Sequence, residues 1–154
     1  SNLDETKYDP YYMSASTNEG ANAIRRWVDD INNDFAARMQ WSVTPCYEDA
    51  NHNPIALVDG YDKTVERNII AGKTFIAKAK DSTDPDGDKL TYEWIYYREA
   101  SSFDGDLNLI NENGKLKCVI PKEAKDKVIH FILRVTDDGT PSLTSYRRVI
   151  LSCK

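Results

Sequence analysis

The chain has no long apolar run and no cluster of basic residues, and these two absences narrow the classes of protein to which it can belong. No apolar stretch approaches the roughly 20 residues that span a bilayer. Ser1 to Pro10 is polar, so we expect neither a transmembrane helix nor a signal peptide, although a chain cleaved or excised from a longer one would look the same. Lysine and arginine are scattered and the formal net charge is −5, which gives no electrostatic reason to expect nucleic acid or an anionic membrane as partner.

Histidine and cysteine are also scarce. His52 and His130 are the only histidines, and no spacing of cysteine and histidine is typical of a zinc site or a Ser/His/Asp triad. Three cysteines, Cys46, Cys118 and Cys153, leave one unpaired if a disulfide forms. A disulfide between Cys118 and Cys153 and free buried cysteines both stay open, and the free form is favoured. Because neither a zinc site nor a catalytic triad is indicated, we expect no catalytic residue in this chain.

Residues 16–39 have the periodicity of an amphipathic helix. The apolar residues that fall on one face are Ile24, Trp27, Val28, Ile31, Phe35 and Met39. Ser16 and Glu19 have the spacing of a capping box, but Gly20 in the first turn allows the helix to begin as late as Asn18. One helix is predicted here.

After the helix the pattern changes. Pro45, Pro54 and several Asn and Asp residues favour an extended connector, and from about Asn53 apolar residues recur with period two. The turn signals "DPDGD", "NENG" and "DDGTP" separate these runs. Short strands with a central tryptophan, Trp94, predict an immunoglobulin-like β-sandwich of about 100 residues. The fold class is therefore mainly β, with an N-terminal amphipathic helix packed on the sandwich.

The same patterns divide the chain into three parts. Residues 1–15 have no sustained period and are interpreted as a tail or as the end of an upstream domain. Residues 16–52 form the helix and its connector, and residues 53–154 form the sandwich.

The outward faces of the predicted strands are unusually apolar. If Trp94 and Phe131 point into the core, the opposite faces carry Ile95, Tyr97, His130 and Ile132, with Tyr146 and Ile150 or Val149 and Leu151 on the last strand. An ordinary solvent face would be more polar. The helix has a matching apolar stripe, so we predict that Trp27, Ile31 and Phe35 cover part of this sheet.

The stretch "DSTDPDGDKLTYEW", residues 81–94, contains five acidic residues and nearly matches a helix-loop-helix calcium loop. That loop normally lies between two helices, whereas this stretch runs into a strand, so we interpret the match as accidental. Two alternatives remain. One is a looser, cadherin-like calcium site formed by Asp81, Asp84, Asp86 and Asp88, with Asp137 or Asp138 helping. The other is a plain turn in which Asp side chains accept backbone N–H groups and Gly87 supplies a positive φ. The turn is favoured, so no cofactor is expected and calcium is the alternative.

Aromatic side chains are the second candidate site, because flat rings on a sheet can stack on sugars. Trp94 and Tyr92 fall on the inward face and Trp27 on the helix stripe, so structural roles explain them. The aromatic residues that remain as candidate carbohydrate-binding residues are Tyr97, Tyr96, Tyr47 and Phe103.

Four segments of the chain resemble one known family: "NDFAARMQWSVTP", "NHNPIALV", "DSTDPDGDKLTYEWIYYREA" and "ILRVTDDGTPSLTSYRRVIL". The family comprises secreted bacterial proteins that join a nucleoside-hydrolase-like domain to an immunoglobulin-like C-terminal domain, and it is named for a cellulose-binding member. The resemblance extends from about Ile24 to the end, and "RRWVDDINNDFAARMQW" is its most specific part.

This resemblance implies an extracytoplasmic, polysaccharide-related protein whose catalytic domain lies upstream of the present chain. The family's nucleoside-hydrolase-like domain resembles an α/β scaffold that holds calcium with a cluster of aspartates, and no segment here alternates strands and helices in that way. We therefore expect a non-enzymatic accessory module that packs against or orients the upstream domain. The alternative is a module that binds cellulose or another glucan.

Overall fold

The structure is a computed structural model and describes residues 18–154. Its helix, α2, spans Asn18–Val43. The strands are β1 (Val65–Ile69), β2 (Thr74–Lys78), β3 (Thr91–Tyr96), β4 (Leu109–Glu112), β5 (Lys115–Val119), β6 (Val128–Thr136) and β7 (Thr144–Cys153). The predicted tail, the helix start at Ser16 and the capping box lie outside the described residues.

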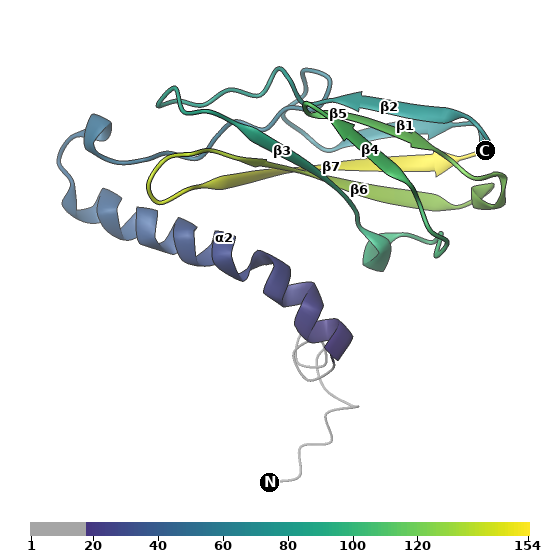
Figure 1. Cartoon of the computed structure of the whole chain (residues 1–154), viewed down its shortest axis with the longest axis horizontal. Helices are drawn as coiled ribbons and strands as arrows, with labels where there is room; N and C mark the ends of the chain where they lie inside the picture. Colours follow the sequence, from purple (N-terminus) through teal and green to yellow (C-terminus); the bar gives the residue numbers. More distant parts are fainter. Residues whose placement is uncertain (1–17) are drawn as a thin grey trace, which may run out of the picture.

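The strands form two sheets that face each other, as Figure 1 shows. One sheet has four strands in the order β1-β7-β6-β3, and the other has three in the order β2-β5-β4. β1 runs parallel to β7, and all the other pairs are antiparallel. The predicted immunoglobulin-like β-sandwich is confirmed.

The core lies between the two sheets, and inward residues alternate along the strands as period two requires. Trp94 on β3 pairs with Leu133 on β6, and Phe131 on β6 pairs with Val149 on β7; all four are buried. Trp94 Nε1 donates to the Gly114 carbonyl at 3.1 Å. Gly114 has φ +77°, and a Cβ there would approach the Tyr92 ring to 3.0 Å, so both the turn and the packing require glycine.

The three cysteines are free, as favoured from the sequence. Cys118 and Cys153 are buried in the core and Cys46 is exposed. Burial raises the pKa of the Cys118 thiol to about 11, so this side chain is an uncharged apolar group at neutral pH.

Helix α2 runs across the outer face of the four-stranded sheet (Figure 1). Its predicted apolar stripe is only partly used for this contact. Trp27 packs edge-on against Tyr146, with ring centroids 5.1 Å apart, as predicted. The prediction was wrong for Ile31 and Phe35, which are 59% and 62% exposed. Asp30 faces the sheet and forms an ion pair with Arg134. The helix is therefore rotated relative to the orientation that its apolar stripe predicted.

Candidate functional site

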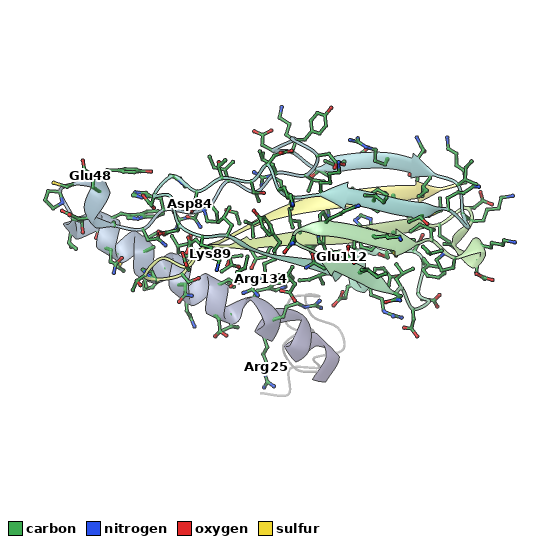
Figure 2. The ribbon with its side chains drawn as sticks, turned by 45° about the horizontal axis from the view of Figure 1, so that its top comes forward. Arg25, Glu48, Asp84, Lys89, Glu112 and Arg134 are labelled. Carbon is green, nitrogen blue, oxygen red and sulfur yellow. The ribbon has the colours of Figure 1, made fainter. Side chains whose placement is uncertain are left out.

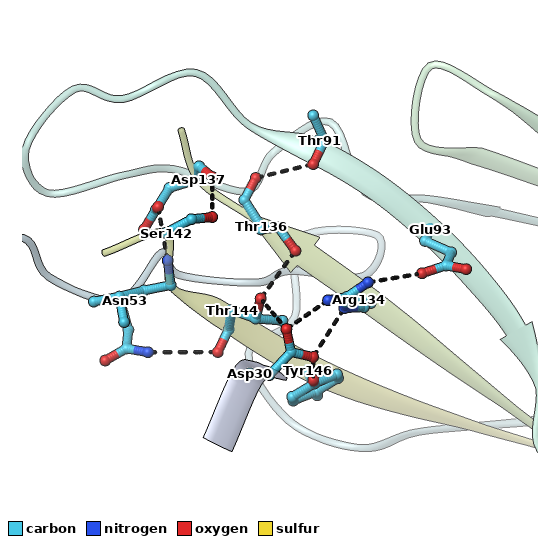
Figure 3. Close-up of polar contacts among 11 residues, drawn as sticks. Asp30, Asn53, Thr91, Glu93, Arg134, Thr136, Asp137, Ser142, Thr144 and Tyr146 are labelled. Atoms are coloured by element: carbon cyan, nitrogen blue, oxygen red, sulfur yellow. Dashed lines mark hydrogen bonds and ion pairs between the residues drawn. The ribbon is translucent and has the colours of Figure 1, made fainter. Parts of the chain in front are cut away.

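A single carboxylate on α2, that of Asp30, joins the helix to the four-stranded sheet. Arg134 on β6 donates to both carboxylate oxygens, from Nε at 3.0 Å and from Nη2 at 2.5 Å. The hydroxyls of Thr144 and Tyr146, both on β7, donate to the same carboxylate. Figure 3 shows the four side chains, which we call the Asp30 cluster. A bidentate, charge-assisted pair of this kind fixes both distance and orientation.

Burial and mutual hydrogen bonding set the charge states in the Asp30 cluster. The Asp30 side chain is only 9% exposed, and Arg134 also contacts Glu93 at 3.2 Å. The hydrogen bond to Asp30 raises the pKa of Arg134, so the guanidinium stays charged. Burial, and then the hydrogen bond to Asp30, raise the pKa of Tyr146, so its hydroxyl stays protonated and can donate. The cluster is therefore an attachment point whose groups are already engaged with one another.

A groove of about 740 Å³ lies between α2 and the outer face of the sheet, beside the Asp30 cluster. It combines aromatic rings with carboxylates and guanidinium groups, a mixture that offers flat apolar surface and hydrogen bonds together. The ring and charged side chains that line it are Trp27, Asp30, Asp34, Asp62, Tyr97, Tyr146, Arg147 and Arg148. Such a lining is chemically suited to a polar ligand with an apolar face, such as a sugar.

Tyr97, a predicted carbohydrate-binding residue, lines this groove. It directly follows β3, and its N–H donates to the carbonyl of His130 on β6 at 2.8 Å. The guanidinium carbons of Arg26 and Arg148 lie 5.9 and 5.6 Å from its ring centroid. These cation–π contacts occupy the ring, so a stacked sugar would have to displace an arginine.

Tyr96 and Phe103 have structural positions. The Tyr96 ring lies 6.2 Å from that of Phe131, and its hydroxyl donates to the Phe103 carbonyl. The expectation that Phe103 is exposed was wrong, because its side chain is buried in the core. The loop that carries it is held against β6 by a hydrogen bond from the Ser102 N–H to the Val128 carbonyl at 2.9 Å, which turns the Phe103 ring inward.

Tyr47 is the most exposed of the predicted aromatic residues, at 61%. It lies in the short 3-10 turn Tyr47–Asp49, and its ring stacks on His52 at 3.6 Å with an interplanar angle of 9°. His52 in turn stacks on Trp41 at 5.6 Å and 7°. Trp41 Nε1 donates to the Asn51 carbonyl at 2.8 Å, and the N–H of His52 donates to Asp86 at 2.6 Å. The three parallel rings, Tyr47, His52 and Trp41, form an aromatic stack that is fixed to the acidic turn.

The acidic stretch folds as a turn closed by Asp84. Asp84 Oδ1 accepts the N–H groups of Asp86 at 2.8 Å and of Asp88 at 3.1 Å, and Gly87 has φ +83°. This is the geometry that the plain-turn alternative predicted. Figure 2 shows Asp84 near the end of the sandwich, in the region of Glu48.

The same turn brings three predicted calcium ligands together. The carboxylates of Asp84, Asp86 and Asp88 have oxygens within 4.8 Å of one another, while Asp81 is not part of this group. Burial, and then neighbouring carboxylates beginning with Asp84, raise the pKa of Asp88. Carboxylate oxygens are the donors that calcium prefers, so the residues fit in type, and a calcium site formed by Asp84, Asp86 and Asp88 stays a prediction.

Replacing Asp84 separates its role in the turn from a role in metal binding. Asp84→Ala removes the acceptor of two backbone N–H groups and should destabilise the protein by about 1 kcal/mol. Asp84→Asn keeps the Oδ1 acceptor and relieves repulsion from Asp86 and Asp88, so it should be at least as stable as the wild type. Melting temperatures measured with EDTA and with calcium should agree for all three proteins. A melting temperature that calcium raises in the wild type but not in Asp84→Asn would assign the turn to metal binding.

The Asp30 cluster was not predicted from the sequence, although one signal for it is present. Arg134 and Tyr146 occupy outward positions that pair directly in the register of β6 and β7. A charged and a hydroxyl side chain at paired positions of an otherwise apolar face indicate a polar partner, and only the fold shows that this partner is Asp30.

In the part of the chain that the structure describes, no helix is both long and apolar enough to cross a membrane. Two facing sheets, with a helix anchored across one of them, define the class of protein: an immunoglobulin-like β-sandwich module with an attached N-terminal helix.

Residues 74–153 match the model of the family described as "Cellulose-binding protein Sde0182, C-terminal domain", and the chain belongs to this family. A similar solved structure is that of a nucleoside hydrolase-related hypothetical protein from Saccharophagus degradans, described as associated with carbohydrate metabolism. It is 39% identical with a TM-score of 0.82, and the match covers 85% of this chain and 33% of that one. The present chain thus spans about a third of that protein's length.

More distant similarities are to immunoglobulin-like repeats. The EC21-23 segment of human CDH23 is 19% identical, with a TM-score of 0.47, and the match covers 66% of this chain and 35% of that segment. Titin domain M7 is 14% identical, with a TM-score of 0.40, over 68% of this chain and 96% of that domain. No curated protein sequence matched the chain.

Proposed function

We propose that this chain is the non-catalytic C-terminal accessory module of an extracytoplasmic, polysaccharide-related protein, and that it packs against and orients a preceding nucleoside-hydrolase-like domain. The family description, a C-terminal domain, and the nucleoside hydrolase-related relative support this proposal. So does the placement of α2. The large hydrophobic core cluster takes its members from residues 56–153, so the sandwich is complete without the helix.

The observation that carries the proposal is that α2 is nevertheless held firmly on the sandwich. The Asp30 cluster, the Trp27–Tyr146 contact, the ion pair of Arg26 with Glu99 and the bond from Trp41 to Asn51 attach it along its length. A helix that the core does not need, and that is held in one orientation, is suited to carry a neighbouring domain at a set angle.

Calorimetry tests this proposal by comparing the 154-residue chain with the longer protein that carries the preceding domain. An interface contributing about 2 kcal/mol should raise the melting temperature of the module by roughly 4–8 °C, because a domain of this size shifts by roughly 2–4 °C per kcal/mol. The 154-residue chain should hydrolyse neither nucleosides nor soluble glucans. Two results would contradict the proposal: unfolding of the longer protein in two transitions, each at the melting temperature of the corresponding separate domain, or hydrolysis by the 154-residue chain.

A second candidate function, binding of cellulose or another glucan, is favoured by the aromatic stack. Tyr47 is held flat by the rings beneath it and remains mostly exposed, as a sugar-stacking surface requires. The groove with Tyr97 offers a second surface, although its arginines already contact the ring.

Sedimentation with insoluble cellulose distinguishes the two functions. Under the accessory-module proposal the wild-type chain stays in the supernatant. Under the alternative it sediments, and Tyr47→Ala should weaken binding about fivefold, since an aromatic contact contributes about 1 kcal/mol. Tyr61→Ala is the matched control, because Tyr61 is 58% exposed but has an arginine, Arg67, beside its ring. Tyr97→Ala tests the groove in the same assay. Sedimentation lost in Tyr47→Ala or Tyr97→Ala and kept in Tyr61→Ala would replace the first proposal by the second.

A further inference from the structure

Helix α2 carries a row of large, exposed apolar side chains. Val28, Ile31, Phe35 and Met39 are 37%, 59%, 62% and 49% exposed, and we call these four residues the α2 stripe. Their spacings of three and four residues place them on one side of the helix. Single exposed apolar side chains are ordinary, but four large ones in a row mark an interaction surface.

Three of the α2 stripe residues, Val28, Phe35 and Met39, point away from the sandwich, and Ile31, at the edge of the stripe, borders the groove between the helix and the sheet. The residues that contact or face the sheet side are Trp27, Asp30, Asp34, Ala37 and Trp41. At 100° per residue, the centre of this set and the centre of the α2 stripe lie roughly 125° apart around the helix axis. The helix therefore has two separate faces, one anchored by the Asp30 cluster and the other available to a partner.

The comparisons indicate what that partner is. The match to the Saccharophagus degradans protein covers 85% of this chain, whereas residues 53–154 make up only about two thirds of it, so the similarity reaches beyond the sandwich into the helix and connector. The remaining two thirds of that relative lie outside the match. A helix retained with the sandwich, beside a large further portion of chain, is placed to contact that portion.

The size of the α2 stripe favours a covalently linked partner over a second copy of this chain. Stable association between separate molecules buries about 800 Å² on each side and uses about 20–30 residues, far more than one stripe of four side chains offers. A partner on the same polypeptide is present at a high effective concentration, so a small apolar contact is sufficient.

We infer that the α2 stripe is the surface on which the preceding nucleoside-hydrolase-like domain docks, through an apolar patch of its own. This inference rests on the proposed function and names the interface that the proposal requires.

Cysteine labelling tests the docking surface directly. The background is Cys46→Ser, which leaves only the buried Cys118 and Cys153 in this chain. Phe35→Cys reports on the centre of the α2 stripe, and Asp29→Cys is the matched control, since it is exposed and lies roughly 120° from Phe35 around the helix. Each variant is made in the 154-residue chain and in the longer protein, and maleimide modification at the introduced cysteine is followed by peptide mass spectrometry.

We expect both cysteines to react at similar rates in the 154-residue chain. In the longer protein Phe35→Cys should react at least tenfold more slowly, while the reactivity of Asp29→Cys should be unchanged. If neither site is protected but calorimetry still shows a raised melting temperature, the proposed function survives and the docking surface is wrong. If neither the protection nor the raised melting temperature appears, the docking surface and the proposed function are both wrong. The same holds if the reading frame encodes no nucleoside-hydrolase-like domain.

Two other occupants of the α2 stripe give distinct results, and either would overturn the inference. A second copy would make the 154-residue chain a dimer in sedimentation equilibrium, and Phe35→Glu would dissociate it. If residues 1–17 occupied the α2 stripe, they would protect Phe35→Cys already in the 154-residue chain, and their removal would restore its reactivity.

Discussion

Replacing Phe131 by alanine should lower the free energy of unfolding by about 3–5 kcal/mol, the loss typical of a large aromatic side chain removed from a core. Phe131 is fully buried at the centre of β6. Its ring lies 5.9 Å from that of Phe75 on the opposite sheet and 6.2 Å from that of Tyr96 on the neighbouring strand. Both sheets therefore lose contacts at once, and a cavity remains between them.

Urea unfolding monitored by tryptophan fluorescence measures this loss. The next residue along the strand provides the control: Ile132 is half-buried, points to the opposite face and lines the groove beside α2. Ile132→Ala should cost less than half as much as Phe131→Ala, because water and the groove already border its side chain. Equal losses for the two variants would show that the outer face is packed as tightly as the core.

The sandwich was predictable because burial on one face imposes period two along each strand. The alternation of Phe131, Leu133 and Val135 with half-buried neighbours is visible in the sequence and in the structure alike. The register of β7 was left open between two sets of residues, and the structure shows that Val149 and Leu151 point inward. Strand β1 was not singled out, because "VERNI" has one buried residue and no alternation to detect.

The orientation of the helix was not predictable in the same way. An apolar stripe predicts a buried face only when the helix has nothing stronger to bind, and the sequence does not show which long-range polar partners will meet it. Asp30 is 104 residues from Arg134, and no local pattern connects the two. Similarly, the aromatic stack joins Trp41, Tyr47 and His52 across a connector without periodicity. The contacts that form the Asp30 cluster and the aromatic stack are therefore long-range or lie in irregular structure, where no sequence period reveals them.

Removing the carboxylate of Asp30 should loosen the attachment of α2 to the sandwich. Asp30→Ala leaves Arg134 without its bidentate partner beneath the helix, and loss of one member of a buried pair typically costs about 3–5 kcal/mol. Arg134 is 29% exposed and keeps its contact with Glu93, so the lower end of this range is expected. Asp29→Ala, one residue away on the exposed side of the helix, should change stability by less than about 0.5 kcal/mol.

The loss in Asp30→Ala should be confined to the helix, because the core cluster contains no residue of α2. Amide hydrogen exchange should therefore accelerate across residues 18–43 while β6 and β7 stay protected. Adding Arg134→Met should recover much of the lost stability, since it removes the uncompensated charge and leaves an apolar side chain of similar length. If Asp30→Ala instead accelerates exchange throughout the sandwich, the helix is part of the cooperative fold and not an attached arm. In the longer protein the same variant should also make a cysteine introduced at Phe35 more reactive, because loss of the Asp30 cluster loosens the helix that presents the α2 stripe to the neighbouring domain.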